Sequence, residues 1–170
     1  MTPEERLKSL GITLPEAPQP LGAYVPCVQT GTLLYVSGIL PLREGALARR
    51  GKVGDTVSPE DAREDARQIV INALAVVTSF LGSLERVKRC VRLNGYVASA
   101  PDFAEQPKVL NAASDLLFEI LGDAGRHTRT AIGVAVLPLD APLEIDFIFE
   151  IAPQVSSDRA TVSQPAEMRF

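Results

Sequence analysis

An arginine stands at the head of an apolar segment whose alternate side chains are unusually small. Arg129 is followed at every second position by Ala131, Gly133 and Ala135. Strands seldom use glycine and alanine where a bulky side chain fits, so this face is predicted to admit another surface closely. An arginine there can donate two parallel hydrogen bonds to a carboxylate. A surface or ion-paired arginine is the alternative interpretation.

Carboxylates alternate with apolar residues in the segment from 143 to 151. Glu144, Asp146 and Glu150 are separated by two and four residues, so all three fall on one face of a strand. A partly buried carboxylate with a raised pKa can orient water and carry protons, and Glu144 is the candidate for that role. The alternative is that all three are ordinary acids on a solvated face.

The turn signal at residues 139–142 predicts that these two segments pair as a hairpin. Leu137 would then lie opposite Glu144, and the pairs on the face covered by helices would all be apolar: Val136–Ile145, Val134–Phe147 and Ile132–Phe149. Arg129 would lie eight residues from the level of Glu144, about 26 Å along the strand. Both could serve one small ligand only from different subunits, as in a closed trimer.

Other reactive side chains are few. Cys27 and Cys90 form no CxxC pair, and His127 is the only histidine. Because a zinc site needs three or four good ligands, a metalloenzyme is not expected. Catalysis by a serine and a histidine would have to use His127, which follows the glycine-bounded loop 122–126, and a solvated loop histidine is the preferred interpretation.

Length and charge bound the class of protein. The 170 residues predict one domain with a substantial core. The net charge is −4 and the pI is about 5.1, and no run of lysine and arginine forms a basic face, which counts against nucleic-acid binding. No apolar run is long enough to span a bilayer, and residues 1–10 lack the apolar core of a signal peptide. A cytoplasmic protein without a membrane partner is expected.

The clearest element is a helix over Pro59–Leu81, with Ser58 as N-cap, Gly82 as C-cap and apolar residues at helical spacing. A second long helix is expected over 106–121, and a short one begins at Thr2 and ends near Gly11. Strands are predicted at 23–29, 33–40, 87–98, 130–137 and 143–151, with a turn at Gly31-Thr32 and a loop over 43–57.

This order of elements predicts a mixed α+β fold with both long helices on one face of a sheet. The other face must meet water or a partner. Residues 1–20 are predicted to form a helix and a proline-rich linker, 21–152 the folded domain, and 153–170 a mobile or disordered tail.

Several motifs together resemble those of the Rid family, also known as YjgF or L-PSP-type endoribonucleases. They are Arg129–Pro138, Leu143–Asp146, Gly22-Ala23-Tyr24, Val36-Ser37-Gly38 and the helical Asn111. The resemblance runs from about residue 21 to residue 152.

The resemblance implies a trimeric, chorismate mutase-like fold with clefts between subunits. It also implies hydrolysis of imines such as those derived from 2-aminoacrylate, giving a 2-oxo acid and ammonia. Arg129 matches the carboxylate-binding arginine and Glu144 the glutamate that positions water. The matching substrate-binding positions are Tyr24, Ser37, Gly38, Asn111 and Ala131.

Three departures from the family pattern, at four positions, bear on the pocket. Ala131 stands where the family often has cysteine, Ile39 where it often has glutamine, and His127-Thr128 where it usually has Pro-Ala. These changes alter the shape and polarity of the pocket and leave Arg129 and Glu144 in place.

The imine is already electrophilic, so no metal or organic cofactor is expected. A non-catalytic regulatory trimer that binds small molecules in the same clefts is the alternative function, and Arg129 fits both. A ribonuclease is a third possibility, against which the acidic pI counts.

Overall fold

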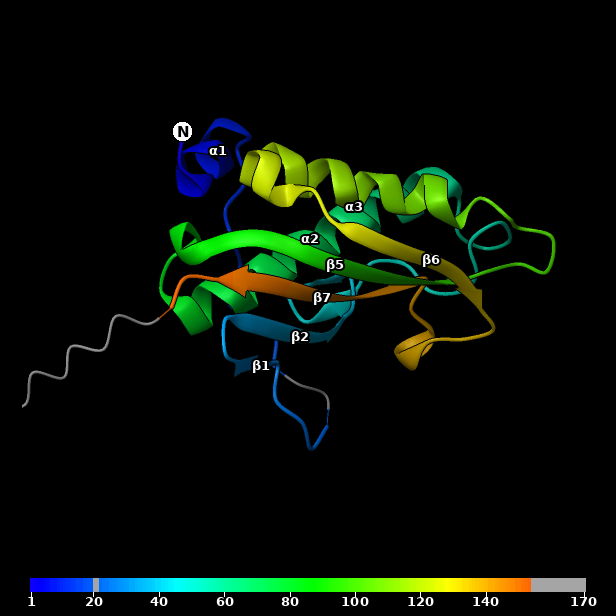
Figure 1. Ribbon diagram of the computed structural model, residues 1–170. Helices are drawn as coiled ribbons and strands as arrows, with labels where there is room; N and C mark the ends of the chain where they lie inside the picture. Colours follow the sequence, from blue (N-terminus) through cyan, green and yellow to red (C-terminus); the bar gives the residue numbers. More distant parts are fainter. Residues whose placement is uncertain (20–21, 154–170) are drawn as a thin grey trace, which may run out of the picture.

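A five-stranded sheet with the strand order β1-β2-β7-β5-β6 forms one layer of the protein (Figure 1). The computed structural model describes residues 1–19 and 22–153. The strands span Cys27–Thr30 (β1), Leu33–Ile39 (β2), Val87–Ala98 (β5), Thr128–Val134 (β6) and Leu143–Ile151 (β7). A separate two-stranded ribbon joins Leu42–Arg43 (β3) to Ala46–Leu47 (β4).

Within the described residues, three α-helices form the second layer: Pro3–Ser9 (α1), Pro59–Leu81 (α2) and Gln106–Leu121 (α3). The long α2 begins where the Ser58 side chain accepts a hydrogen bond from the Asp61 amide, and it ends at Gly82, whose φ of 83° suits glycine. Short 3₁₀ turns follow at Leu84–Arg86, Gly122–Gly125 and Pro138–Asp140. The bounds predicted for α2 are confirmed.

Both long helices cover the same face of the sheet, as predicted (Figure 1). α2 packs on β2 and β7, and α3 packs on β5 and β6. The core between the layers includes Phe147 and Phe149 of β7, whose stacked rings lie 5.8 Å apart. α1 packs at the end of α3, where Leu7 joins the core.

The predicted hairpin of β6 and β7 is wrong, because β5 lies between them. β6 runs parallel to β5, and β7 runs antiparallel to both β5 and β2. The turn at 138–140 is real, but the connection crosses the end of β5. There the amide of Ala98 donates to the carbonyl of Pro142, and that of Ser99 donates to the carbonyl of Val134.

The face predicted for β6 is also wrong, while that of β7 is confirmed. Arg129, Ala131 and Gly133 point toward α3, and Ile132 is 44% exposed on the open face. A Cβ at Gly133 would lie 2.9 Å from Nε2 of Gln106. The small residues of β6 therefore make room for the helix layer of the same chain.

Other boundaries differ by a few residues. β1 begins at Cys27, because residues 22–26 form bends before the strand. β6 begins at Thr128 and ends at Val134. The tail predicted to be flexible lies, from residue 154 on, outside the described residues.

Across residues 1–19 and 22–153, no helix combines the length and apolarity that a membrane crossing requires.

Candidate functional site

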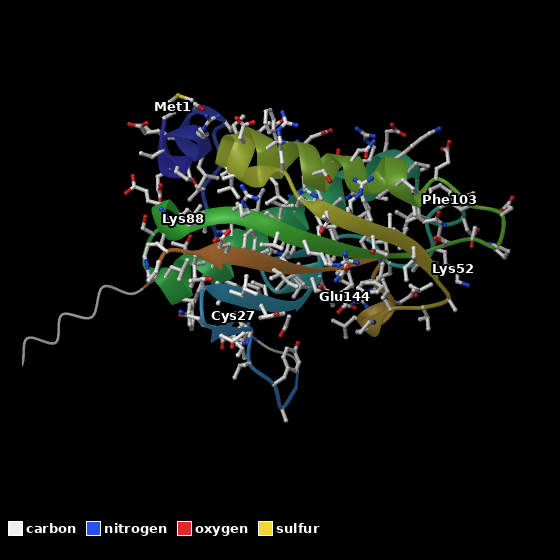
Figure 2. All side chains as sticks on the ribbon, viewed as in Figure 1. Met1, Cys27, Lys52, Lys88, Phe103 and Glu144 are labelled. Atoms are coloured by element: carbon white, nitrogen blue, oxygen red, sulfur yellow. The ribbon has the colours of Figure 1, made fainter. Side chains whose placement is uncertain are left out.

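The structure divides the predicted site residues into two groups on opposite faces of the sheet. The arginine group, Arg129, Asn111 and Ala131, lies between β6 and α3. The glutamate group lies on β2, on β7 and in the loop before β1, and consists of Tyr24, Ser37, Gly38 and Glu144 (Glu144 is labelled in Figure 2).

α3 holds the guanidinium of Arg129 through three residues on successive turns of one helix face. Nη1 donates to Oδ1 of Asn111 and to Oγ of Ser114, both at 3.0 Å, and Nη2 donates to the carbonyl of Pro107 at 3.2 Å. These bonds use three of the five N–H donors of an arginine. Within the described part of the chain, two donors remain for a ligand carboxylate.

Burial lowers the pKa of Arg129, and nearby Asp115 opposes that shift. The group remains cationic, because an arginine pKa starts far above neutrality. A cleft of about 370 Å³ opens beside it, lined by Ser114, Asp115, Phe118, Gly125, Arg126, His127 and Arg129. The arrangement can therefore hold an anionic group at the edge of the sheet.

His127 lies in this cleft and contacts the same serine. Its Nε2 is 3.0 Å from Oγ of Ser114, and its Nδ1 is 2.7 Å from the carbonyl oxygen of Gly125. Burial is the main cause that lowers the pKa of the half-buried ring, and the charge of Arg129 adds to it. The expectation of a solvated loop histidine is wrong, because the ring folds back against α3.

Glu144 is half-buried on the open face, against the backbone of Gly38. A Cβ at Gly38 would lie 2.8 Å from Cδ and 3.1 Å from Cγ of Glu144, so only glycine leaves room for this carboxyl position. A register shift between Val36 and Ile39 places Gly38 there. Burial raises the pKa of Glu144, and the neighbouring Asp146 adds to the rise. A raised pKa suits a group that gives and takes protons.

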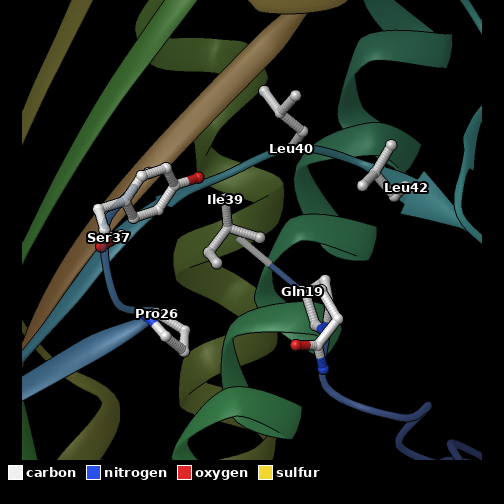
Figure 3. A pocket seen from close by; sticks show the side chains of 9 residues that line it. Gln19, Pro26, Ser37, Ile39, Leu40 and Leu42 are labelled. Atoms are coloured by element: carbon white, nitrogen blue, oxygen red, sulfur yellow. The ribbon is translucent and has the colours of Figure 1, made fainter. Parts of the chain in front are cut away.

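Tyr24, Ser37 and Gly38 line one small cavity of about 30 Å³ (Figure 3). Ser37 donates from its hydroxyl to the carbonyl of Val25 at 2.8 Å, which ties the loop before β1 to β2. Most of the other lining side chains are apolar: Pro18, Pro26, Ile39, Leu40 and Leu42. Ile39, which stands where the family often has glutamine, thus gives this cavity an apolar wall.

A polar network on the open face was not predicted as part of the site. Arg92 donates to Asn94 at 2.8 Å and to Thr130 at 2.7 Å. Asn94 and Tyr96 in turn donate to the two carboxylate oxygens of Asp146, at 2.8 and 3.2 Å. The network thus fixes the acid that neighbours Glu144 on β7.

The sequence held a signal for this network. Arg92, Asn94 and Tyr96 alternate with apolar residues in β5. Period-two alternation places them on one face. The register pairs Tyr96 with Glu144, so this face is the one that carries the glutamate.

Arg129 and Glu144 lie far apart in one chain, though not for the predicted reason. Tyr96 of β5 pairs with Glu144 on one side and with Ile132 on the other. Arg129 is three residues from Ile132, about 10 Å along the strand, and two strands, about another 10 Å, from β7. The two side chains also leave opposite faces of the sheet. The predicted separation of 26 Å is wrong, because it assumed a hairpin of β6 and β7. Even so, one chain does not bring Arg129 and Glu144 together.

Among the described residues, no three histidine, cysteine, aspartate or glutamate side chains gather where they could hold a metal ion.

The chain matches known proteins over almost all of its folded part. A family model described as "YjgF/chorismate mutase-like, putative endoribonuclease" matches residues 4–151. Protein TCP17 of Trypanosoma cruzi is 40% identical over 85% of this chain and 91% of its own length. A 2-iminobutanoate/2-iminopropanoate deaminase of Dermatophagoides farinae is 31% identical over 82% of this chain and 94% of its own. The crystal structure of Atu1372 from Agrobacterium tumefaciens has a TM-score of 0.83 and 47% identity, covering 88% of this chain and 92% of that one.

Proposed function

Because the chain belongs to the YjgF/chorismate mutase-like family, we propose that it hydrolyses reactive 2-imino acids to 2-oxo acids and ammonia. The relative from Dermatophagoides farinae, named a 2-iminobutanoate/2-iminopropanoate deaminase, supports this substrate class. The observation that carries the proposal is the guanidinium of Arg129, which α3 holds at a cleft with two donors left for a carboxylate.

The reaction requires the protein to hold the substrate carboxylate, orient one water molecule and exchange protons. Water adds to the carbon of the C=N bond, and the resulting carbinolamine loses ammonia to leave a 2-oxo acid. Arg129 holds the carboxylate of the substrate, which fixes the position of the imine carbon. Glu144 orients the water, takes its proton during addition and returns a proton to the leaving nitrogen. Burial, with the charge of Asp146, raises its pKa from the ordinary value of a carboxyl group, which makes this side chain a better base.

The two groups act together only if they come from different subunits, and we assign the site to a homotrimer. The positions of Arg129 and Glu144 on opposite faces of one sheet support this assignment. The open face also carries exposed apolar side chains: Val28 is 53% exposed and Tyr35 is 43% exposed. A ring of three copies would cover such faces and repeat one heterologous contact at each interface.

The first test replaces Arg129 with alanine. Loss of a charge-assisted bidentate contact should raise the barrier of the reaction by about 2–4 kcal/mol, a loss of roughly 30- to 1000-fold in kcat/KM. An amino-acid oxidase generates the imine in situ, and formation of the 2-oxo acid is followed. Arg89→Ala is the matched control, since Arg89 is an exposed arginine on β5 that pairs with Glu150. Equal rates for Arg129→Ala and Arg89→Ala would contradict the proposal.

The second test mixes two inactive variants, Arg129→Ala and Glu144→Gln, after dissociation. A shared site is intact only where one chain supplies Arg129 and its neighbour supplies Glu144. In a random 1:1 mixture this holds for about one quarter of the sites, so about one quarter of wild-type activity should return. Subunit exchange is confirmed by mass. Exchange without recovery would refute the shared site while leaving the Arg129 result untouched.

Binding without turnover is the outcome that would favour a regulatory, non-catalytic trimer. Both functions predict that a 2-oxo acid binds to the wild type and not to Arg129→Ala. Only the deaminase predicts faster decay of the imine.

A further inference from the structure

The single histidine is linked to Arg129 through one hydroxyl group. Ser114 of α3 lies between them, with its Oγ 3.0 Å from Nε2 of His127 and 3.0 Å from Nη1 of Arg129. On its other side, Nδ1 of His127 lies 2.7 Å from the carbonyl oxygen of Gly125. These contacts form a continuous chain from the guanidinium to the backbone of the turn at 122–125.

The donors and acceptors of this chain fix the protonation state of the ring. The carbonyl of Gly125 only accepts, so Nδ1 of His127 carries a proton. In the neutral ring Nε2 then accepts from the hydroxyl of Ser114, and Oγ keeps its lone pairs for Arg129. Arg129 donates to Ser114, Ser114 to His127 and His127 to Gly125. Bonds aligned in one direction strengthen one another.

We propose that His127 is a positioning residue that helps to hold Arg129 in its ligand-binding orientation through Ser114, and that protonation of His127 breaks this contact and leaves the arginine held by Asn111 and Pro107 alone. The proposal rests on the proposed function only for the identity of the ligand. In the imidazolium both ring nitrogens donate, so Nε2–H and Nη1–H would both point at Oγ of Ser114. The hydroxyl proton would lose its acceptor, and two cations would share one oxygen.

The charges around the ring favour the neutral form. Arg129 on β6 and Arg126 in the preceding turn line the same cleft, and Asp115 of α3 is the acid that faces it. Asp123 is engaged by Arg126 at 3.1 Å. Burial, with the charge of Arg129, outweighs the opposing effect of the hydrogen bond to Gly125 and lowers the pKa of His127, so the chain of bonds should be intact at neutral pH and fail in acid.

The test uses the imidazole signal in the NMR spectrum, which is unambiguous because the chain has one histidine. The pKa of His127 is measured with and without 2-oxobutanoate. If protonation loosens Arg129, the ligand must favour the neutral ring by reciprocity, and a tenfold affinity difference lowers the pKa by about one unit. A carboxylate acting only through its charge would raise the pKa instead. A rise on binding would overturn the proposal.

A second measurement needs no ligand and therefore separates this proposal from the deaminase activity. Arg129→Ala frees Ser114 to accept from the imidazolium, so the pKa of His127 should rise. The same substitution in a Ser114→Ala background should give a smaller rise, because only the through-space charge of Arg129 is then removed and the link through Ser114 is already broken. An equal rise in both backgrounds would show a charge acting through space and would refute the link.

Conservative replacement gives the third readout. His127→Gln can present an amide oxygen to Ser114 and does not titrate. Its affinity for 2-oxobutanoate should stay within about threefold of the wild-type value at pH 7.5 and should lack the weakening toward pH 5.5 that the proposal predicts for the wild type. His127→Ala should bind weakly at both pH values. If His127→Gln kept the acid weakening, the titrating group would lie elsewhere and the proposal would fail.

Discussion

Replacing Gly38 with alanine perturbs the glutamate group by a single methyl group. The backbone of Gly38 has an ordinary negative φ, so alanine is allowed there. The added Cβ would stand 2.8 Å from Cδ of Glu144, whereas carbon atoms in contact prefer about 3.5–4.0 Å. Oε1 of Glu144 would lie closer still, so the carboxyl group must move by at least about 1 Å, and it can do so because its side chain is long and only half-buried.

Gly38→Ala is expected to lower the rate of the reaction and to leave the free energy of unfolding nearly unchanged. A displacement of about 1 Å in a group that orients a reactant costs on the order of 10²-fold in rate. Alanine restricts the unfolded chain, which stabilises the fold by about 0.4–1 kcal/mol and offsets part of the crowding. The change in free energy of unfolding should thus stay within about 1 kcal/mol. The kcat for imine hydrolysis is measured beside a urea titration.

Gly95→Ala provides the matched comparison, since a Cβ there meets buried Leu110 of α3 instead of the half-buried carboxylate of Glu144. It should lose about 1–3 kcal/mol of stability and keep kcat per folded molecule. The double variant Gly38→Ala/Glu144→Gln should be no slower than Glu144→Gln alone. A wild-type kcat for Gly38→Ala would refute the assignment of Glu144 to this position during catalysis.

Three further predictions concern groups that the structure places in unusual surroundings. Burial raises the pKa of Glu144, so ionisation of this group costs stability as the pH rises through its folded pKa. At pH 8 the Glu144→Gln variant should therefore unfold at a higher urea concentration than the wild type, and the difference between their midpoints should vanish below about pH 4. Equal midpoints at pH 8 would contradict this prediction. Burial raises the pKa of Cys90 to about 12, whereas Cys27 is less buried, so a thiol reagent at pH 8 should modify Cys27 first and Cys90 only upon unfolding. Phe149→Ala should lower the free energy of unfolding by about 3–5 kcal/mol, measured by chemical denaturation, and a loss under 1 kcal/mol would show that the core does not depend on this ring.

The helices were predictable because their signals are local. Ser58 caps the first turn of α2, Gly82 ends it at a positive φ, and the apolar positions between them share one face. Alternation predicted β7 equally well, since its buried residues occupy every second position. Elements whose ends and faces are encoded within a few residues need no knowledge of their neighbours.

Strand order was not predictable from the same local signals. A turn before Pro142 favoured a hairpin, but the sequence of β5, α3 and β6 is a strand-helix-strand unit, which places its two strands in parallel. Giving weight to that unit would have put β5 beside β6. The wrong neighbour then reversed the face of β6, so Arg129 was placed with the carboxylates instead of beside α3.

The identities of the site residues came from motifs, whereas their grouping came only from the structure. Motifs at Val36-Ser37-Gly38 and around Arg129 are short and local, so a resemblance locates them. The link from His127 through Ser114 joins residues from α3 and from the segment before β6. A contact of this kind depends on how tightly a helix and a strand pack, which no spacing in the sequence reports.

Arg129 and Glu144 extend from opposite faces of the sheet, which limits how the two side chains can contact one ligand. A small ligand bound to both within one subunit would have to pass through a sheet whose strands are hydrogen-bonded from β1 to β6. Either one of the two residues does not touch the substrate, or copies of the chain complete each other's sites. In the first case, either Arg129→Ala or Glu144→Gln should leave kcat/KM unchanged. In the second case, both substitutions are damaging and mixed assemblies recover activity, so the single variants and the mixture together decide which arrangement holds.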